Sequence, residues 1–207
     1  MNQTHPLSIL LVLLVALTGN AYSDNEPANG IKHIIKSCDA CHGADARVPT
    51  TVPALAGLKD SYLFEQIENF KQGKRGFDTD DPLVTEMKQQ LNALNKDQLQ
   101  QLAKLYSRRS LLPDPATVPG NSAQGKPLYD EHCKGCHSST IGRFMTKSPD
   151  IANMKGPYLL AQLKLFAADK RLFSVAGKHK SKMVKVAKQF NGEELADIVA
   201  YIKSEQP

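Results

Sequence analysis

Two short runs of the sequence each place two thiols and an imidazole within five residues. They are Cys38–His42 (CDACH) and Cys133–His137 (CKGCH). Thiols separated by two residues can add across the two vinyl groups of a haem as thioethers, and the histidine that follows can bind the iron. The sequence therefore predicts two covalently attached haem c groups, with His42 and His137 as iron ligands. The thioether residues would be Cys38, Cys41, Cys133 and Cys136.

Other chemistry of paired cysteines fits less well. A thioredoxin-like redox pair needs no following histidine and lies in a βαβ pattern, which is missing here. A zinc site would place its two pairs about 15 to 20 residues apart, whereas these pairs are 95 residues apart. Simple disulfides suit an exported protein, but they explain neither the two histidines nor the repetition.

The second axial ligand decides whether such an iron carries electrons or reacts with small molecules. A methionine thioether closes the iron and raises its reduction potential. Met87 follows His42 by 45 residues and Met183 follows His137 by 46, so the two methionines are equivalent. A lone methionine usually fills a core, but this equivalence favours iron ligation. Three residues compete in the second half, namely Met145, Met154 and His179.

Two prolines follow the predicted iron-binding histidines at nearly equal distances. Pro53 lies 11 residues after His42, and Pro149 lies 12 residues after His137. A backbone carbonyl at each proline could accept the imidazole N–H and so fix the tautomer and the ring orientation. They could also be ordinary loop prolines, but the repetition favours the hydrogen-bonding role.

A single register relates the two halves of the chain from the cysteine motif to the C-terminus. The shift is 95 residues at the motif and 96 beyond it, and it matches Tyr62 with Tyr158, Gln66 with Gln162, and Phe70 with Phe166. Apolar residues follow helical spacing in both halves, and alternating strand patterns are absent. Asn95 with Gln98, and Asn191 with Glu194, predict capping boxes at the last helices. We expect an all-α fold of two tandem domains related by internal duplication.

The N-terminal segment and one linker divide the chain. The first 23 residues contain no Lys, Arg, Asp or Glu, and Leu7–Leu17 is apolar except for one serine. This stretch suits a signal peptide and is shorter than the roughly 20 residues of a membrane-spanning helix. We expect a signal peptide over 1–23, with an uncleaved anchor as the alternative. The first domain would occupy 24–110 and the second 126–207, joined by a Pro- and Gly-rich linker over 111–125.

The composition and charge further limit the function. Of the 207 residues, 41% are hydrophobic and 23% are charged, which excludes a disordered or collagen-like chain. Residues 24–110 are electrically balanced, whereas 111–207 carry a formal charge of +5. Because haem propionates would offset this charge, nucleic-acid binding is not indicated. Five lysines surround Met183 and form either a solvated face or a docking patch for an acidic partner: Lys178, Lys180, Lys182, Lys185 and Lys188.

Taken together, these motifs resemble the dihaem cytochrome c4 family over nearly the whole chain after residue 23. The resemblance rests on both cysteine motifs, the Pro53–Gly57 segment (PALAG), the Tyr-Leu-x-x-Gln pattern, the isolated methionine and the final helix. It implies two cytochrome c domains with His/Met ligation and with propionates near their shared interface.

The same resemblance implies a function. It implies a periplasmic electron carrier without enzymatic activity, passing electrons from the bc1 complex towards a terminal oxidase. The partners would be redox proteins, including an acidic subunit of a membrane oxidase. The mature chain would have no membrane span, although peripheral association with a membrane is allowed. Two alternatives are the cytochrome subunit of a flavocytochrome c sulfide dehydrogenase and a small dihaem oxidoreductase.

Overall fold

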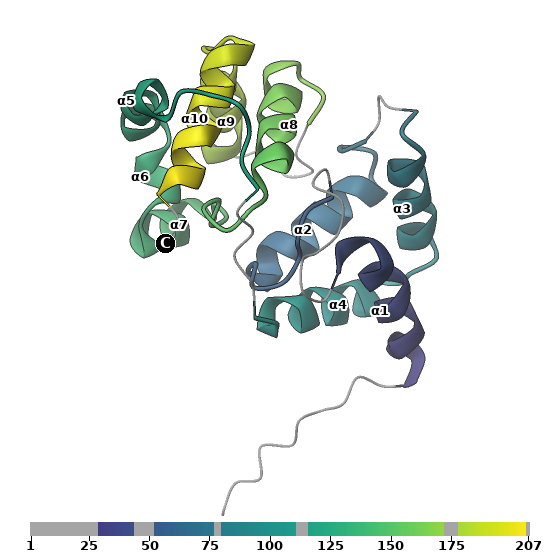
Figure 1. Cartoon of the computed structure of the whole chain (residues 1–207). Helices are drawn as coiled ribbons and strands as arrows, with labels where there is room; N and C mark the ends of the chain where they lie inside the picture. The colour runs from purple at the N-terminus through teal and green to yellow at the C-terminus, as the bar shows by residue number, and fades with distance from the viewer. Residues whose placement is uncertain (1–28, 44–51, 77–79, 111–115, 172–177, 206–207) are drawn as a thin grey trace, which may run out of the picture.

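The computed structural model describes residues 29–43, 52–76, 80–110, 116–171 and 178–205. Within these ranges the regular structure is helical, apart from one isolated antiparallel bridge between Arg75 and Arg171. None of the helices described is long and apolar enough to cross a membrane. The predicted signal peptide lies outside the described residues. The predicted all-α fold of two tandem domains is confirmed (Figure 1).

Four helices are described in the first domain: α1 (Asn29–His42), α2 (Asp60–Lys71), α3 (Pro82–Asn92) and α4 (Lys96–Arg108). The α4 helix begins with the predicted capping box, in which Asn95 and Gln98 each bond the other's backbone N–H. One face of α4 is buried, because its apolar residues recur at helical spacing. That face packs against α2 and contacts α1.

The second domain contains six described helices: α5 (Ser122–His132), α6 (Lys134–His137), α7 (Thr140–Thr146), α8 (Gly156–Ala167), α9 (Lys178–Ala187) and α10 (Gly192–Ser204). The predicted capping box of Asn191 and Glu194 starts α10, which packs against α5 and α8 (Figure 1). Since α5 begins at Ser122, the last four residues of the segment predicted as a linker are helical.

The close crossing of α5 and α10 holds the second cysteine motif in place. It depends on Gly125, because a Cβ atom at this position would lie 1.9 Å from the backbone oxygen of Asp197 on α10. The carboxylate of Asp197 also accepts the backbone N–H of Asn121 at 2.6 Å, which ties the start of α5 to the same turn of α10. Only a residue without a side chain permits this approach.

We therefore predict that Gly125→Ala destabilises the second domain by about 1–3 kcal/mol, the usual cost of overpacking. Gly192→Ala is the matched control, since a Cβ atom there meets nothing within 4 Å. Its effect should stay within about 0.5 kcal/mol. Urea unfolding of both variants, followed by circular dichroism, measures the difference. Equal stability of the two variants would contradict the described helix crossing.

Candidate haem sites

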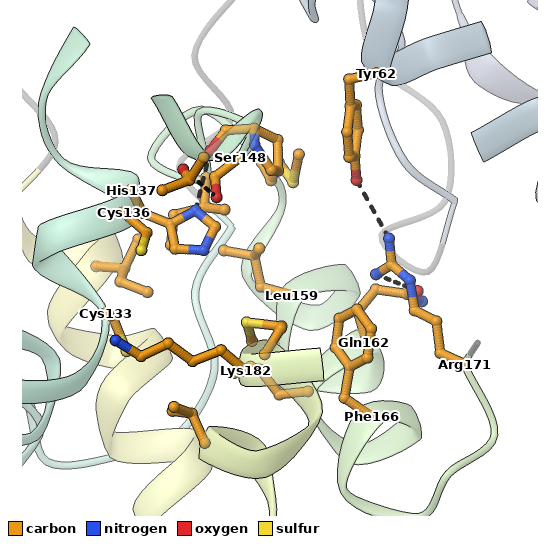
Figure 2. A pocket seen from close by; sticks show the side chains of 18 of the residues that line it. Tyr62, Cys133, Cys136, His137, Ser148, Leu159, Gln162, Phe166, Arg171 and Lys182 are labelled. Carbon is orange, nitrogen blue, oxygen red and sulfur yellow. Dashed lines mark hydrogen bonds between the residues drawn. The ribbon is translucent and has the colours of Figure 1, made fainter. Parts of the chain in front are cut away.

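The predicted cysteine, histidine and methionine residues of the second site line a largely apolar cavity. Cys133, Cys136 and His137 line it from the end of α5 and from α6, and Met183 lines it from α9. Figure 2 shows the two cysteines and the histidine around one space, with Leu159 of α8 beside them. The space measures about 1140 Å³ including its open mouth. Its apolar walls and the three motif residues are the features expected of a site for a covalently bound cofactor.

The competing ligand candidates of the second domain have different environments. Met154 also lines the cavity, but it is 7% exposed and belongs to the apolar core, as its match to Leu58 in the repeat predicts. Met145 lies on α7 with its side chain 72% exposed. The side chain of His179 lies outside the described residues. Among the described side chains, Met183 is therefore the best candidate for the second ligand.

In the first domain, the predicted site residues lie on two helices. Cys38, Cys41 and His42 occupy the end of α1, and Met87 lies in the middle of α3. Cys38 and Met87 are half-buried and pack against the same apolar core. Residues 44–51 and 77–79, which lie between these elements in the chain, are outside the described ranges.

Both iron-binding candidates contact the predicted proline carbonyls. The Nδ1 atom of His42 lies 2.9 Å from the backbone oxygen of Pro53, and that of His137 lies 3.0 Å from the oxygen of Pro149. Burial lowers the pKa of both histidines, although the hydrogen bond to the carbonyl opposes this effect. A neutral imidazole that donates its Nδ1–H to a carbonyl leaves the Nε2 lone pair for a metal.

The four cysteines are free and half-buried. Burial, with a smaller contribution from the neighbouring Asp39, raises the pKa of Cys38. Burial and then the neighbouring Cys136 raise the pKa of Cys133 to about 12. Both thiols are therefore protonated near neutral pH. Neither motif forms a disulfide in the structure. The residues fit covalent attachment of a haem at each motif.

An ion pair that the sequence analysis did not identify fixes the first cysteine motif. Asp39, between the two cysteines, accepts hydrogen bonds from both terminal nitrogens of Arg109 at 2.6 and 3.1 Å. The hydroxyl of Tyr106 donates to the same carboxylate at 2.6 Å. Bidentate, charge-assisted contacts of this kind are strong and directional. They hold the end of α1 against the end of α4.

The second motif is held differently. Lys134 stands where the first motif has Asp39, and it forms an exposed pair with Asp130 at 3.2 Å. The guanidinium of Arg143 on α7 donates to the backbone oxygens of His137 and Ser138, at 3.1 and 3.0 Å. The sequence pattern does not indicate this contact either. The α7 helix thus supports the histidine from its C-terminal side.

Three of the five lysines around Met183 have described side chains. Lys182 and Lys185 are exposed on α9, and Lys188 is exposed directly after this helix. Lys182 also lines the cavity. Lys188 pairs with Asp169 at 2.5 Å, which offsets its charge. The side chains of Lys178 and Lys180 lie outside the described residues. Part of the predicted docking patch therefore lies at the second site.

The helical fold and the two cysteine motifs define a protein made of tandem c-type cytochrome domains. The family model for cytochrome c matches residues 27–105 and 122–206. A cytochrome c4 of Pseudomonas aeruginosa is 30% identical over 210 residues, covering 95% of this chain and 97% of that protein. The cytochrome c4 structure from Acidithiobacillus ferrooxidans aligns with a TM-score of 0.65 at 22% identity, covering 82% of this chain and 99% of that one.

A second relative is named for a different role. The thiosulfate dehydrogenase electron acceptor of Thiomonas intermedia is 29% identical over 140 residues, covering 62% of this chain and 61% of that protein. The family match and the P. aeruginosa relative span most of the chain. The chain belongs to the cytochrome c family and, within it, to the dihaem cytochromes c4. It is an electron-transfer protein whose cysteine pairs fit two covalent haem c groups.

We predict that Asp39→Ala lowers the free energy of unfolding of the first domain by about 1.5–3 kcal/mol, because it removes hydrogen bonds to a charged group. The duplication supplies the control. Lys134→Ala removes only an exposed pair at the equivalent position and should cost about 1 kcal/mol or less. Guanidinium unfolding of both holoproteins tests the difference. A larger cost for Lys134→Ala would refute the anchoring role of Asp39.

Proposed function

We propose that this protein is a periplasmic one-electron carrier that takes electrons from the bc1 complex and delivers them towards a terminal oxidase. One observation carries the proposal: Met183 lines the same cavity as His137 and both cysteines of the second motif. A thioether and an imidazole at one iron would leave no coordination position for a substrate. Such an iron exchanges electrons and does not activate small molecules.

Each part of the second site has a separate role in this proposal. The bound haem supplies an iron that changes by one electron between its ferric and ferrous states. Cys133 and Cys136 would hold the macrocycle covalently, and the carbonyl of Pro149 orients the neutral imidazole of His137. Apolar side chains of α8 and α10 line the remaining walls and limit access of water. A dry, apolar surrounding is one of the means by which a protein tunes a redox centre.

We assign the first site by the same logic. His42 contacts the carbonyl of Pro53 as His137 contacts that of Pro149. Met87 occupies in α3 the repeat position that Met183 occupies in α9. His42 and Met87 would therefore bind the first iron, and His137 and Met183 would bind the second. The attachment residues of the first haem are Cys38 and Cys41.

The proposed location rests on the sequence of residues 1–23, and the proposed partners rest on the positive charge of the lysines of α9. Residues 1–23 would direct export, and the mature chain would work in the periplasm, free or loosely attached to the membrane. The lysines of α9 would guide the second haem to an acidic partner, such as a subunit of a membrane oxidase, because complementary charges speed encounter. Nucleic acid is not among the proposed partners.

A second candidate function is supported by the similarity to the Thiomonas electron acceptor. In that case the chain would accept electrons from a sulfur-oxidising enzyme, as a dihaem subunit of a flavocytochrome c-like complex also would. The first proposal requires a free carrier, whereas a bound subunit would remain with its partner at high salt. Purification from the native cells in high salt distinguishes the two.

Carbon monoxide binding tests whether both irons are closed. We predict that the dithionite-reduced wild-type protein shows no spectral change with carbon monoxide. Met183→Ala and Met87→Ala should each make one of the two haems reactive, because each removes one thioether. Met154→Leu is the matched control within the same cavity and should remain unreactive.

Carbon monoxide binding by half of the haem in the wild-type protein would show that one iron is open. The proposed carrier function would then be wrong for that site. If Met154→Leu, and not Met183→Ala, opened the second iron, the ligand assignment of the second domain would be overturned.

A kinetic prediction concerns the lysines of α9. The double variant Lys182→Gln/Lys185→Gln should slow oxidation of the second haem by ferricyanide a few-fold at low ionic strength, since it removes two exposed positive charges beside the site. The difference should vanish at high salt. Lys96→Gln/Lys104→Gln on α4 removes the same charge from the first domain. Equal slowing in the two double variants would argue against a local patch. Stopped-flow absorbance measures both.

A further inference from the structure

The helix that carries Met87 is only lightly covered by the rest of the first domain. Most side chains of α3 are exposed, and Leu91 is its one buried residue. Figure 1 shows α3 at the outer side of the first domain, away from the second domain, and its main partner is α2. A helix of this length is not stable alone and depends on packing. The position of Met87 therefore depends on what holds α3 against α2.

The turn that follows α2 is enclosed by side chains of α3. Gly76 in this turn has a φ of +63°, a left-handed conformation that favours glycine. A Cβ atom at this position would lie 2.5 Å from Cγ1 of Val84 and 3.6 Å from Cε of Lys88, both on α3. It would also lie 3.3 Å from Cε1 of Phe70 on α2. The absence of a side chain at Gly76 thus allows α3 to pack directly on the backbone of the turn.

Hydrogen bonds tie α2 and α3 together reciprocally. The Nζ of Lys88 on α3 donates to the backbone oxygen of Gly76, which lies beyond the end of α2. Lys71, the last residue of α2, donates from its Nζ to the backbone oxygen of Leu94, which lies beyond the end of α3. Each helix therefore supplies a lysine that binds a carbonyl after the other helix. These bonds hold α3 at two points along its length.

The residues that contact Gly76 lie on the same side of α3 as Met87. Val84 precedes Met87 by three residues and Lys88 by four, and residues three or four apart are neighbours on a helix. Valine in a helix has one strongly preferred rotamer. Its Cγ1 atom therefore cannot turn away from Gly76 without cost, and a displacement there would move the helix and Met87 with it.

The size of such a displacement can be compared with what an iron ligand tolerates. Carbon atoms in contact lie about 3.5–4.0 Å apart, so a Cβ atom 2.5 Å from Val84 would push α3 away by about 1 Å. Distances between a metal and its ligands are fixed within about 0.2 Å. A shift of this size would therefore take the sulfur of Met87 out of reach of an iron bound by His42.

The second domain does not repeat this arrangement. At a shift of 96 residues, Gly76 and Val84 correspond to Leu172 and Lys180, whose side chains lie outside the described residues. The sequence therefore has neither the glycine nor the valine at the second site. A substitution at Gly76 should affect the first iron alone, and the second haem serves as an internal control.

We propose that Gly76 is a positioning residue for the first haem, because its close contact with Val84 holds α3 where Met87 would close the iron. This inference rests on the proposed function, which assigns Met87 as the axial ligand. Gly76 itself touches neither the iron nor the ligand. It acts through the position of α3, and its loss should open the first iron to small molecules.

Carbon monoxide binding to the dithionite-reduced protein tests this role. Gly76→Ala should make half of the haem reactive, whereas the wild-type protein should not react. Gly73→Ala is the matched control, because Gly73 also has a left-handed φ of +67° but a Cβ atom there meets nothing within 4 Å. Both substitutions impose the same kind of backbone strain, and only the contact with α3 differs. Equal reactivity of the two variants would show that the contact has no such role.

A second substitution separates the contact from the strain. Val84→Ala removes the Cγ1 atom that the new Cβ atom would meet, so the double variant Gly76→Ala/Val84→Ala should lose most of the reactivity of Gly76→Ala. Val84→Ala alone should remain closed. A double variant as reactive as Gly76→Ala would mean that backbone strain or misfolding opens the iron, and the proposal would be wrong.

Combination with the methionine variants identifies the iron that opens. Gly76→Ala/Met87→Ala should leave half of the haem reactive, because both changes act on the same iron. Gly76→Ala/Met183→Ala should make all of the haem reactive. Near-infrared magnetic circular dichroism of the oxidised protein gives an independent readout, in which Gly76→Ala should lose half of the His/Met signal and Gly73→Ala none. Complete reactivity of Gly76→Ala/Met87→Ala would place the effect at the second iron and overturn the proposal.

The same measurements distinguish this inference from the proposed function. If Met87→Ala opens one iron and Gly76→Ala opens none, the positioning role is wrong and the carrier function stands. If Met87→Ala opens none, the ligand assignment of the first domain is wrong, and the positioning role of Gly76 is refuted with it.

Discussion

In the second domain a cavity occupies space that packed apolar side chains would fill in an ordinary all-α domain of this size. Ile198 and Ile202 of α10 are buried and line this cavity, so the same helix face contributes both to the core and to the wall of the site. Domains below about 100 residues bury little surface and are marginally stable. A covalently attached haem therefore completes the fold as well as the redox centre, and the positions of His137 and Met183 depend on the helices that surround the same space.

Duplication gives the molecule a second constraint. Two copies of one domain pack through equivalent residues, as two subunits do in an isologous dimer. Arg75 bonds Tyr158 and Gln162 across the boundary, and its counterpart Arg171 bonds Tyr62 and Gln66 in the same way. Because each domain contributes the equivalent residue, a charged residue at such an interface occurs twice. Two arginines therefore meet there.

The sequence predicted those features whose signals are local or repeated. Three signals occur once in each half: the cysteine motif, the asparagine capping box, and the spacing between the histidine and the proline. Each is visible within a short stretch of sequence. The Arg75–Arg171 pair was missed, although the same shift relates its members. An arginine in a polar turn ordinarily remains at the surface, and only the packing of the domains shows that both are buried. Arg143 was missed because its guanidinium bonds backbone oxygens, which no side-chain pattern indicates. Asp39 was missed because its partner Arg109 lies 70 residues further along the chain.

The central claim is that a histidine and a methionine close each of two irons. Near-infrared magnetic circular dichroism of the fully oxidised protein tests it most directly, because the charge-transfer bands of ferric haem distinguish His/Met from His/His and high-spin sites. The account predicts only the His/Met signature, with an intensity that corresponds to two haems per chain. A high-spin or His/His component equal to one haem would contradict it. The ligand assigned to that iron, Met87 or Met183, would then be wrong, and the position would be open or bound by another histidine.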